Sequence, residues 1–142
     1  MTKLYEADFY TWALTQADAA RRRSANEIDW DNVAEELESL GKSEARELSS
    51  RYLVLLTHLL KWIYQPDKRS KSWRATIQLQ RKQIGDHLKE NPGLKSRERK
   101  IFASAYAGAR IAASGETEQD EEVFPEAAPF TMKQAKDAAW LP

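Results

Sequence analysis

The chain has 142 residues, no cysteine, and 22 basic against 22 acidic residues, which gives a formal net charge of zero. The lack of cysteine excludes disulfide bonds, thiolate zinc sites and cysteine nucleophiles together. An apolar content of 42% with five tryptophans is typical of a chain that packs a core, so we expect a single domain over residues 1–142.

The hydropathy pattern argues against a targeting or membrane segment. Residues 1–12 mix charged with apolar side chains and lack the continuous apolar run of a secretory signal. The longest apolar stretch, residues 52–64, is interrupted by polar residues and is shorter than the roughly 20 residues that cross a bilayer. By elimination we expect a cytoplasmic location and no membrane partner.

The two signs of charge are segregated along the chain. Residues 26–48 carry eight acidic and two basic residues, a net charge of −6, and residues 116–126 carry six acidic residues and no base. Between them, residues 61–82 carry seven basic residues and one acid, a net charge of +6. Two acidic segments therefore flank a basic one.

Apolar residues at helical spacing predict the first two helices. The first spans about residues 8–22, with Asp8 as its cap. The second begins near Asp29 and has a regular amphipathic pattern, formed by Trp30, Val33, Leu37 and Leu40. Gly41 either ends this helix or lies inside one longer helix that continues to Tyr64, and the pattern leaves both alternatives open.

A third helix over residues 52–64 is the expected hydrophobic centre. Ten of its thirteen residues are apolar and lie all around it, so other helices must enclose it. The helix ends before Pro66, because proline disfavours helical geometry at the preceding residue. A fourth helix begins near Ser70 or Ser72 and ends at Asn91.

The remaining sequence predicts a fifth helix, a loop and a short last helix. Residues 96–114 are rich in alanine on the inner positions, which predicts a close helix crossing. An acidic loop comes next, over residues 115–130, and the Thr131 to Gln134 spacing of a capping box starts a C-terminal helix over residues 131–140. The predicted fold is all-α: a single-domain helical bundle of four to five main helices plus a short C-terminal helix after the acidic loop.

Several short sequence words occur in order along the chain. They are LYEADFYTW at residues 4–12, EELESLG at 35–41, HLLKW at 58–62, YQP at 64–66, SWRATI at 72–77, QR at 80–81, FPE at 124–126 and PFT at 129–131. Together they resemble the domain of unknown function 29 family, a group of small bacterial helical proteins. The resemblance implies an all-helical fold and a bacterial origin, and it implies no established activity, substrate or catalytic residues.

His58 is the histidine with a candidate chemical role. With Glu35 and Glu38, which are one helical turn apart, it offers an acid-base site or a carboxylate-rich metal site. A hydrogen-bonded structural histidine and a charged outer helix face explain the same residues without an ion. His87 lies on a separate helix, and the sequence predicts no acidic partner for it. No phosphate-loop or hydrolase motif occurs, and we expect no cofactor.

Bases alternate with aromatic residues in the segment 61–82. The candidate binding residues there are Lys61, Lys68, Arg69, Lys71, Arg74 and Arg81. Such cations bind phosphates or acidic groups, and flat aromatics such as Trp62 and Trp73 stack on the bases of single strands. Both tryptophans also have the helical positions of core residues, and the cations are able to pair with the acidic segments of the same chain.

From these observations we favour a non-enzymatic protein-interaction or regulatory module. Its recognition surfaces are the basic segment 61–82 and the acidic loop 116–126, and its partner is an acidic protein or a second copy of the chain. Nucleic-acid binding through the basic segment is the first alternative, although a net charge of zero is unfavourable for nonspecific binding. A metal or acid-base site around His58 is the second alternative.

Overall fold

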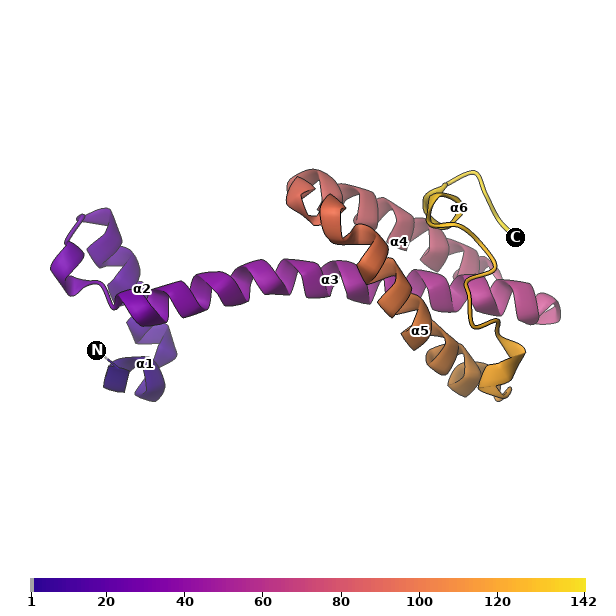
Figure 1. Cartoon of the computed structure of the whole chain (residues 1–142), viewed down its shortest axis with the longest axis horizontal. Helices are drawn as coiled ribbons and strands as arrows, with labels where there is room; N and C mark the ends of the chain where they lie inside the picture. The colour runs from indigo at the N-terminus through magenta and orange to yellow at the C-terminus, as the bar shows by residue number, and fades with distance from the viewer. Residues whose placement is uncertain (1) are drawn as a thin grey trace. The chain divides into compact units, whose positions relative to one another are not determined.

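A computed structural model describes residues 2–142 of the chain, and within them every regular element is helical (Figure 1). The α-helices are α1 (Thr2–Ala7), α2 (Phe9–Arg21), α3 (Trp30–Tyr64), α4 (Lys71–Glu90), α5 (Glu98–Thr117) and α6 (Met132–Lys136). Short 3-10 turns lie between them, η1 (Ala25–Glu27), η2 (Pro66–Lys68), η3 (Pro92–Arg97) and η4 (Glu121–Val123). The predicted all-α fold is confirmed, with four long helices and a short C-terminal one.

The chain divides into two compact units, Met1–Ser43 and Glu44–Pro142. Helix α3 is continuous through Gly41, which decides between the two alternatives that the sequence leaves open. Proline ends helices far more strongly than glycine does, and the first proline after Trp30 is Pro66. That the whole chain forms one domain stays a prediction.

The first unit is held together by polar links between α2 and the segment before α3. Asp8 caps α2 as predicted, accepting a hydrogen bond from the Thr11 amide. The indole of buried Trp12 donates to Asp29 at 3.1 Å. The side chain of Gln16 is also buried, and it accepts from the Asp29 amide at 2.7 Å and donates to the Glu27 carbonyl at 3.2 Å. These contacts fix where α3 begins.

The apolar face predicted for the start of α3 exists, but most of it lies at the surface. The side chains of Trp30, Leu37 and Leu40 are each 63% exposed. Large apolar residues repeated along one helix face at this exposure are uncommon in globular proteins.

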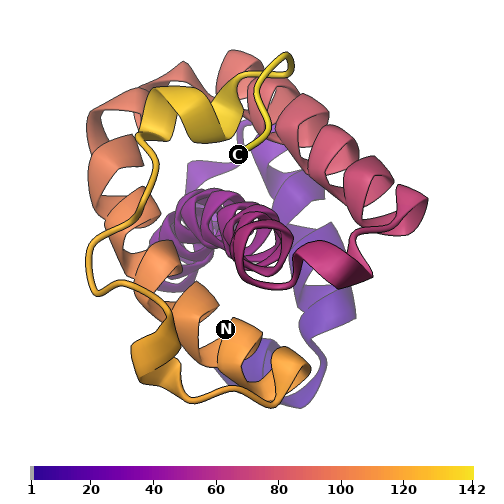
Figure 2. The ribbon, with the colours of Figure 1, turned by 90° about the vertical axis from the view of Figure 1, so that its right-hand side faces the viewer.

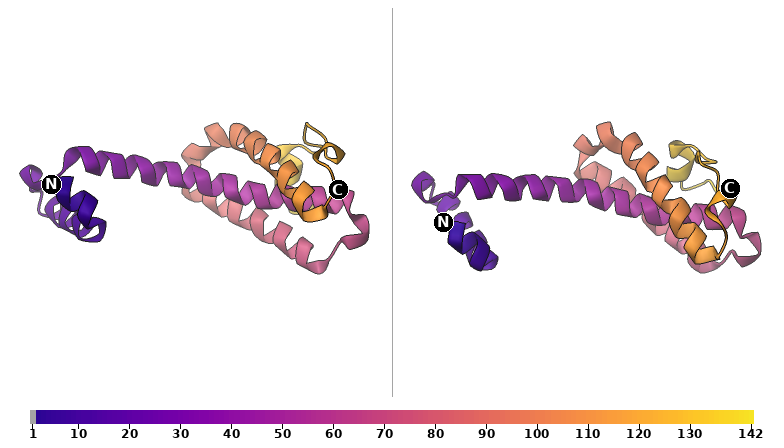
Figure 3. Two further views of the ribbon diagram at one scale, coloured as in Figure 1. Left: turned by 90° about the horizontal axis from the view of Figure 1, so that it is seen from below. Right: turned by 60° about the horizontal axis from the view of Figure 1, so that its bottom comes forward.

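The core of the second unit surrounds the second half of α3, as the sequence predicts. Figures 2 and 3 show α4 and α5 on different sides of this part of α3. The α3 residues in this core are Leu48, Tyr52, Leu55, Leu56, Leu59, Leu60 and Trp62, all at most 6% exposed. Such a helix is stable only inside a layer of other helices, because apolar side chains lie all around it.

Helix α5 approaches α3 closely through small residues. Ala105, Ala109 and Ala113 are buried, and a Cβ placed on Gly108 would lie 3.2 Å from the Leu53 Cδ1 atom. The close crossing predicted from the alanine-rich pattern is therefore present, and Gly108 belongs to it.

The boundary predicted for the end of α5 is wrong. Gly115 does not end the helix, which continues to Thr117 and stops where Glu118 takes a left-handed conformation with φ of 57°. The acidic connection after it is anchored to α5 through two backbone carbonyls. The Phe124 carbonyl accepts a hydrogen bond from Arg110, and the Pro125 carbonyl accepts one from the Tyr106 hydroxyl.

The last helix has the predicted capping box but is shorter than predicted. Thr131 and Gln134 bond reciprocally, side chain to backbone, at the start of α6. The helix ends at Lys136, not at residue 140, because the extended backbone of Asp137 terminates it. The chain then turns so that Trp140 packs its ring against Phe130.

Candidate functional site

Two of the six predicted basic residues support the fold. The Lys61 side chain is nearly buried, with its Nζ atom 3.1 Å from the Glu116 carboxylate and 4.7 Å from the centre of the Trp73 ring. Arg81 is buried and donates to the Ala135 carbonyl at 2.8 Å, and burial lowers the pKa of its guanidinium. Both residues attach other segments to the core.

The other four predicted bases lie at the surface, around the connection between α3 and α4. Lys68 and Arg69 are on the turn, and Lys71 and Arg74 are in the first turn of α4. Ser70 begins that helix by accepting a hydrogen bond from the Trp73 amide at 3.1 Å. Between described side chains, none of the four bases forms an ion pair. Their charge is therefore available to a ligand.

Two of these cations lie over the ring of Trp62. The guanidinium carbons of Arg69 and Arg74 lie 5.0 Å and 5.6 Å from the ring centre, within the range of cation–π attraction. Arg69 also donates from Nε to the Trp62 carbonyl at 2.7 Å, which fixes its position. A surface pocket of about 620 Å³ results, which we call the cationic pocket, lined by Trp62, Arg69, Ser70, Lys71 and Arg74.

Two acidic residues near the end of α5 and in the acidic connection after it contact Lys61 and Arg110. Glu116 at the end of α5 pairs with Lys61, and Glu121 lies 3.6 Å from the Arg110 guanidinium. The prediction that the basic segment pairs with the chain's own acids therefore holds for Lys61 and not for the four bases of the turn.

The three residues predicted for a site around His58 belong to different compact units. Glu35 and Glu38 belong to the first compact unit and are exposed, whereas half-buried His58 belongs to the second. Its Nδ1 atom lies 2.8 Å from the Val54 carbonyl of its own helix. This is the structural, hydrogen-bonded histidine that the sequence leaves as one alternative.

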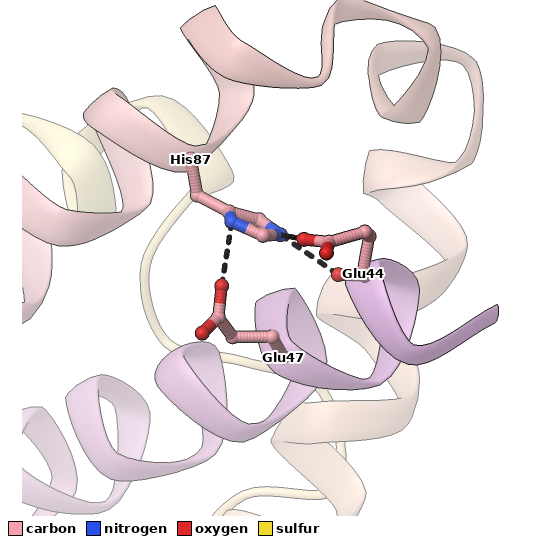
Figure 4. A group of neighbouring side chains, drawn as sticks. All are labelled: Glu44, Glu47 and His87. Atoms are coloured by element: carbon pink, nitrogen blue, oxygen red, sulfur yellow. Dashed lines mark hydrogen bonds and ion pairs between the residues drawn. The ribbon is translucent and has the colours of Figure 1, made fainter. Parts of the chain in front are cut away.

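The prediction that His87 lacks an acidic partner is wrong. The imidazole on α4 is 5% exposed and lies against two carboxylates of α3 (Figure 4). Nδ1 is 2.6 Å from Oε2 of Glu47, and Nε2 is 2.8 Å from the Glu44 carbonyl oxygen and 3.5 Å from its carboxylate. The acids are one helical turn apart on α3, but no sequence pattern connects them with a histidine some forty residues later.

The surroundings of His87 define what this cluster does. Both ring nitrogens face oxygen atoms of α3. The ligand atoms of Glu44, Glu47 and His87 lie within 4.8 Å of one another, but each carboxylate faces a different ring nitrogen. A metal ion binds along the lone pair of one nitrogen, so this geometry fits a polar clamp between α3 and α4 better than a metal centre.

A second buried polar network has no signal in the local sequence. Glu98, 6% exposed at the start of α5, accepts a 2.5 Å hydrogen bond from the Tyr52 hydroxyl and lies 2.7 Å from the Lys136 ammonium. Burial and the neighbouring carboxylate raise the pKa of Tyr52, so the phenol stays neutral and donates. The network joins α3, α5 and α6.

The geometry defines a small all-α protein with an open cationic pocket at the turn between two helices of its second unit. The family model for Domain of unknown function DUF29 matches residues 4–141, so the chain belongs to that family, as its sequence words suggest. No curated protein and no solved structure matches the chain. Among the described residues, no helix has the length and apolar character needed to cross a membrane.

Proposed function

We propose that this protein is a non-enzymatic interaction module whose cationic pocket binds an acidic segment of a protein partner. The observation that carries the proposal is the group of exposed cations around Trp62, which no described carboxylate neutralises. Uncompensated charge of one sign in a concave surface attracts ligands of the opposite sign and speeds their association.

An acidic peptide fits this pocket better than a single-stranded nucleic acid. Nonspecific binding of single strands uses open aromatic faces on which bases stack. Here Arg69 and Arg74 cover Trp62, which is 6% exposed, and the Lys61 ammonium covers Trp73. Tyr64, the third aromatic of the segment, packs edge-on against buried Phe124. The aromatics that the sequence offers for stacking are therefore in use within the protein.

The test is binding of a fluorescein-labelled poly-glutamate peptide, followed by anisotropy at low and at physiological salt. The variant Lys68→Glu/Lys71→Glu/Arg74→Glu reverses three exposed bases and keeps Arg69, which hydrogen-bonds the Trp62 carbonyl. The matched control Lys89→Glu/Lys95→Glu/Lys100→Glu makes the same charge change at exposed positions elsewhere in the second unit. A labelled single-stranded oligothymidine forms the second arm.

We expect the wild type and the control to bind the peptide alike, and the pocket variant to bind it at least about tenfold more weakly. Added salt should weaken binding by the wild type, because the contacts are exposed charge pairs. Equal affinity of the pocket variant and the control overturns the proposal. Binding of the oligothymidine without binding of the peptide replaces it with the nucleic-acid alternative.

A further inference from the structure

The first half of α3 carries an apolar stripe with acidic residues beside it. The apolar members are the exposed Trp30, Leu37 and Leu40, at helical spacings of seven and three. Asp31, Glu35 and Glu38 line the stripe on one side, because their positions on the helix are rotated by about 80–140° from Trp30. All three acids are exposed and form no ion pair with another described side chain. We call these six residues the acidic stripe.

The exposed face of α4 has the opposite character. Lys71, Arg74 and Lys82 lie on it at spacings that bring them to one side of the helix, and Leu79, 51% exposed, lies next to them. Lys82 pairs with Asp86 at 2.7 Å, an exposed pair of the kind that exchanges easily with other partners. We call these four residues the basic face, and it is continuous with the cationic pocket through Lys71 and Arg74.

Charge complementarity distinguishes between two surfaces that could bind the acidic stripe. Two copies of the stripe packed against each other would bury their leucines but would bring the two sets of acids together, which is unfavourable. The basic face offers an apolar residue for the leucines and cations for the acids. Amphipathic helices bind in this manner, with apolar anchors at helical spacing and charged pairs at the edge.

We propose that the acidic stripe of one chain binds the basic face of a second copy of the same chain. This inference rests on the proposed function, since it names the acidic partner of the cationic surface as the protein itself. Each chain carries both surfaces, so in a two-fold symmetric pair the contact would form twice. The reciprocal contact leaves no free acidic stripe and no free basic face.

Sedimentation of the full chain over a range of concentrations tests this inference. The acid variant is Glu35→Lys/Glu38→Lys, the base variant is Lys71→Glu/Arg74→Glu, and the apolar variant is Leu37→Gln/Leu40→Gln. All six positions are exposed, so circular dichroism should show an unchanged helical fold. The control is Arg99→Glu/Lys100→Glu, which changes the same charge as the base variant outside the basic face.

We expect the wild type and the control to have about twice the 16.3 kDa mass of one chain, and each of the three variants to have the mass of one chain. An equimolar mixture of the acid and base variants should recover the double mass. The unchanged stripe of the base variant then binds the unchanged basic face of the acid variant, and the two charge-reversed surfaces bind each other. A wild type that stays monomeric at every concentration, or a double mass retained by both charge variants, overturns the inference.

The two proposals can fail separately. If the wild type is monomeric but still binds poly-glutamate through Lys71 and Arg74, self-association is rejected. The proposal that the cationic pocket binds an acidic ligand then stands. The opposite result is a wild type that fails to bind the peptide while the mixture of acid and base variants recovers the double mass. That result rejects binding of acidic ligands in general and leaves self-association supported. If both hold, the poly-glutamate peptide should dissociate the pair by competition.

Discussion

His87 on α4 lies 2.6 Å from Glu47 on α3, measured from Nδ1 to Oε2, while its other ring nitrogen faces the Glu44 carbonyl. The ring is almost fully buried, whereas the Glu47 side chain is 45% exposed. The buried imidazole thus gives α4 a polar contact with α3 at two successive turns. This clamp joins the start of the second compact unit to the end of α4.

Removing the imidazole should destabilise the packing of α4 against α3. We expect His87→Ala to lower the free energy of unfolding by about 1–3 kcal/mol, because the substitution removes the buried ring and its polar contacts with Glu44 and Glu47. Urea denaturation followed by circular dichroism measures the change. His58→Ala is the matched control and should cost less, since His58 is half-buried and bonds only to its own helix. An equal cost for the two variants would mean that the clamp adds nothing.

Alkaline pH should destabilise the protein through Tyr52. Its pKa is raised above the ordinary value of 10.0 by burial and by Glu98, so above pH 10 the unfolded chain loses a proton that the folded chain keeps. Stability from this group is therefore complete below about pH 10 and falls as pH rises further. Denaturant midpoints from pH 8 to 11 should decline for the wild type. Tyr52→Phe should decline less, and parallel curves would contradict the assignment.

The same substitution at two glycines should have opposite effects. Gly108→Leu should lower the free energy of unfolding by about 1–3 kcal/mol, because even a Cβ there lies 3.2 Å from Leu53. Gly41→Leu should raise helix stability by up to about 1 kcal/mol, because no atom lies within 4 Å of its added Cβ and leucine favours helices. Thermal unfolding by circular dichroism measures both, and loss of helix in Gly41→Leu would contradict a continuous α3.

Substitutions at Arg81 and Arg74 should have different effects, the first on stability and the second on peptide binding. Arg81→Ala removes a buried guanidinium that holds the Ala135 carbonyl, and we expect a loss of about 1.5–3 kcal/mol and faster proteolysis after residue 130. Arg74→Ala should leave unfolding unchanged within about 0.5 kcal/mol, because its side chain is exposed. Peptide binding should weaken in Arg74→Ala. A stable Arg81→Ala protein with an undigested C-terminus would show that Arg81 is not structural.

Much of the fold can be predicted from local sequence signals. Proline after Tyr64 and cap residues at Asp8, Ser70 and Thr131 mark helix ends because they act on the neighbouring backbone alone. The end of α5 is different, since Gly115 is compatible with either helix or turn, and the acidic connection is held by hydrogen bonds from α5 to the Phe124 and Pro125 carbonyls. Tertiary contacts of this kind leave no local pattern.

The candidate site divides in the same way. Local composition marks the basic turn, and four of its six candidate residues lie at the surface, two of them over Trp62. Which cations are buried depends on distant partners, as with Lys61 and Glu116, so local sequence patterns do not separate them. The acidic contacts of His87 escape prediction for the same reason, because its acceptors come from another helix.

The position of Trp62 gives the protein an optical reporter of its own. Two guanidinium groups lie over the indole, and they are the groups that an acidic ligand would draw toward itself. A change in their position alters the electric field at the ring, and with it the emission wavelength and intensity. In a chain whose other four tryptophans are replaced by phenylalanine, occupancy of the pocket becomes visible without a label, at concentrations far below those that sedimentation requires.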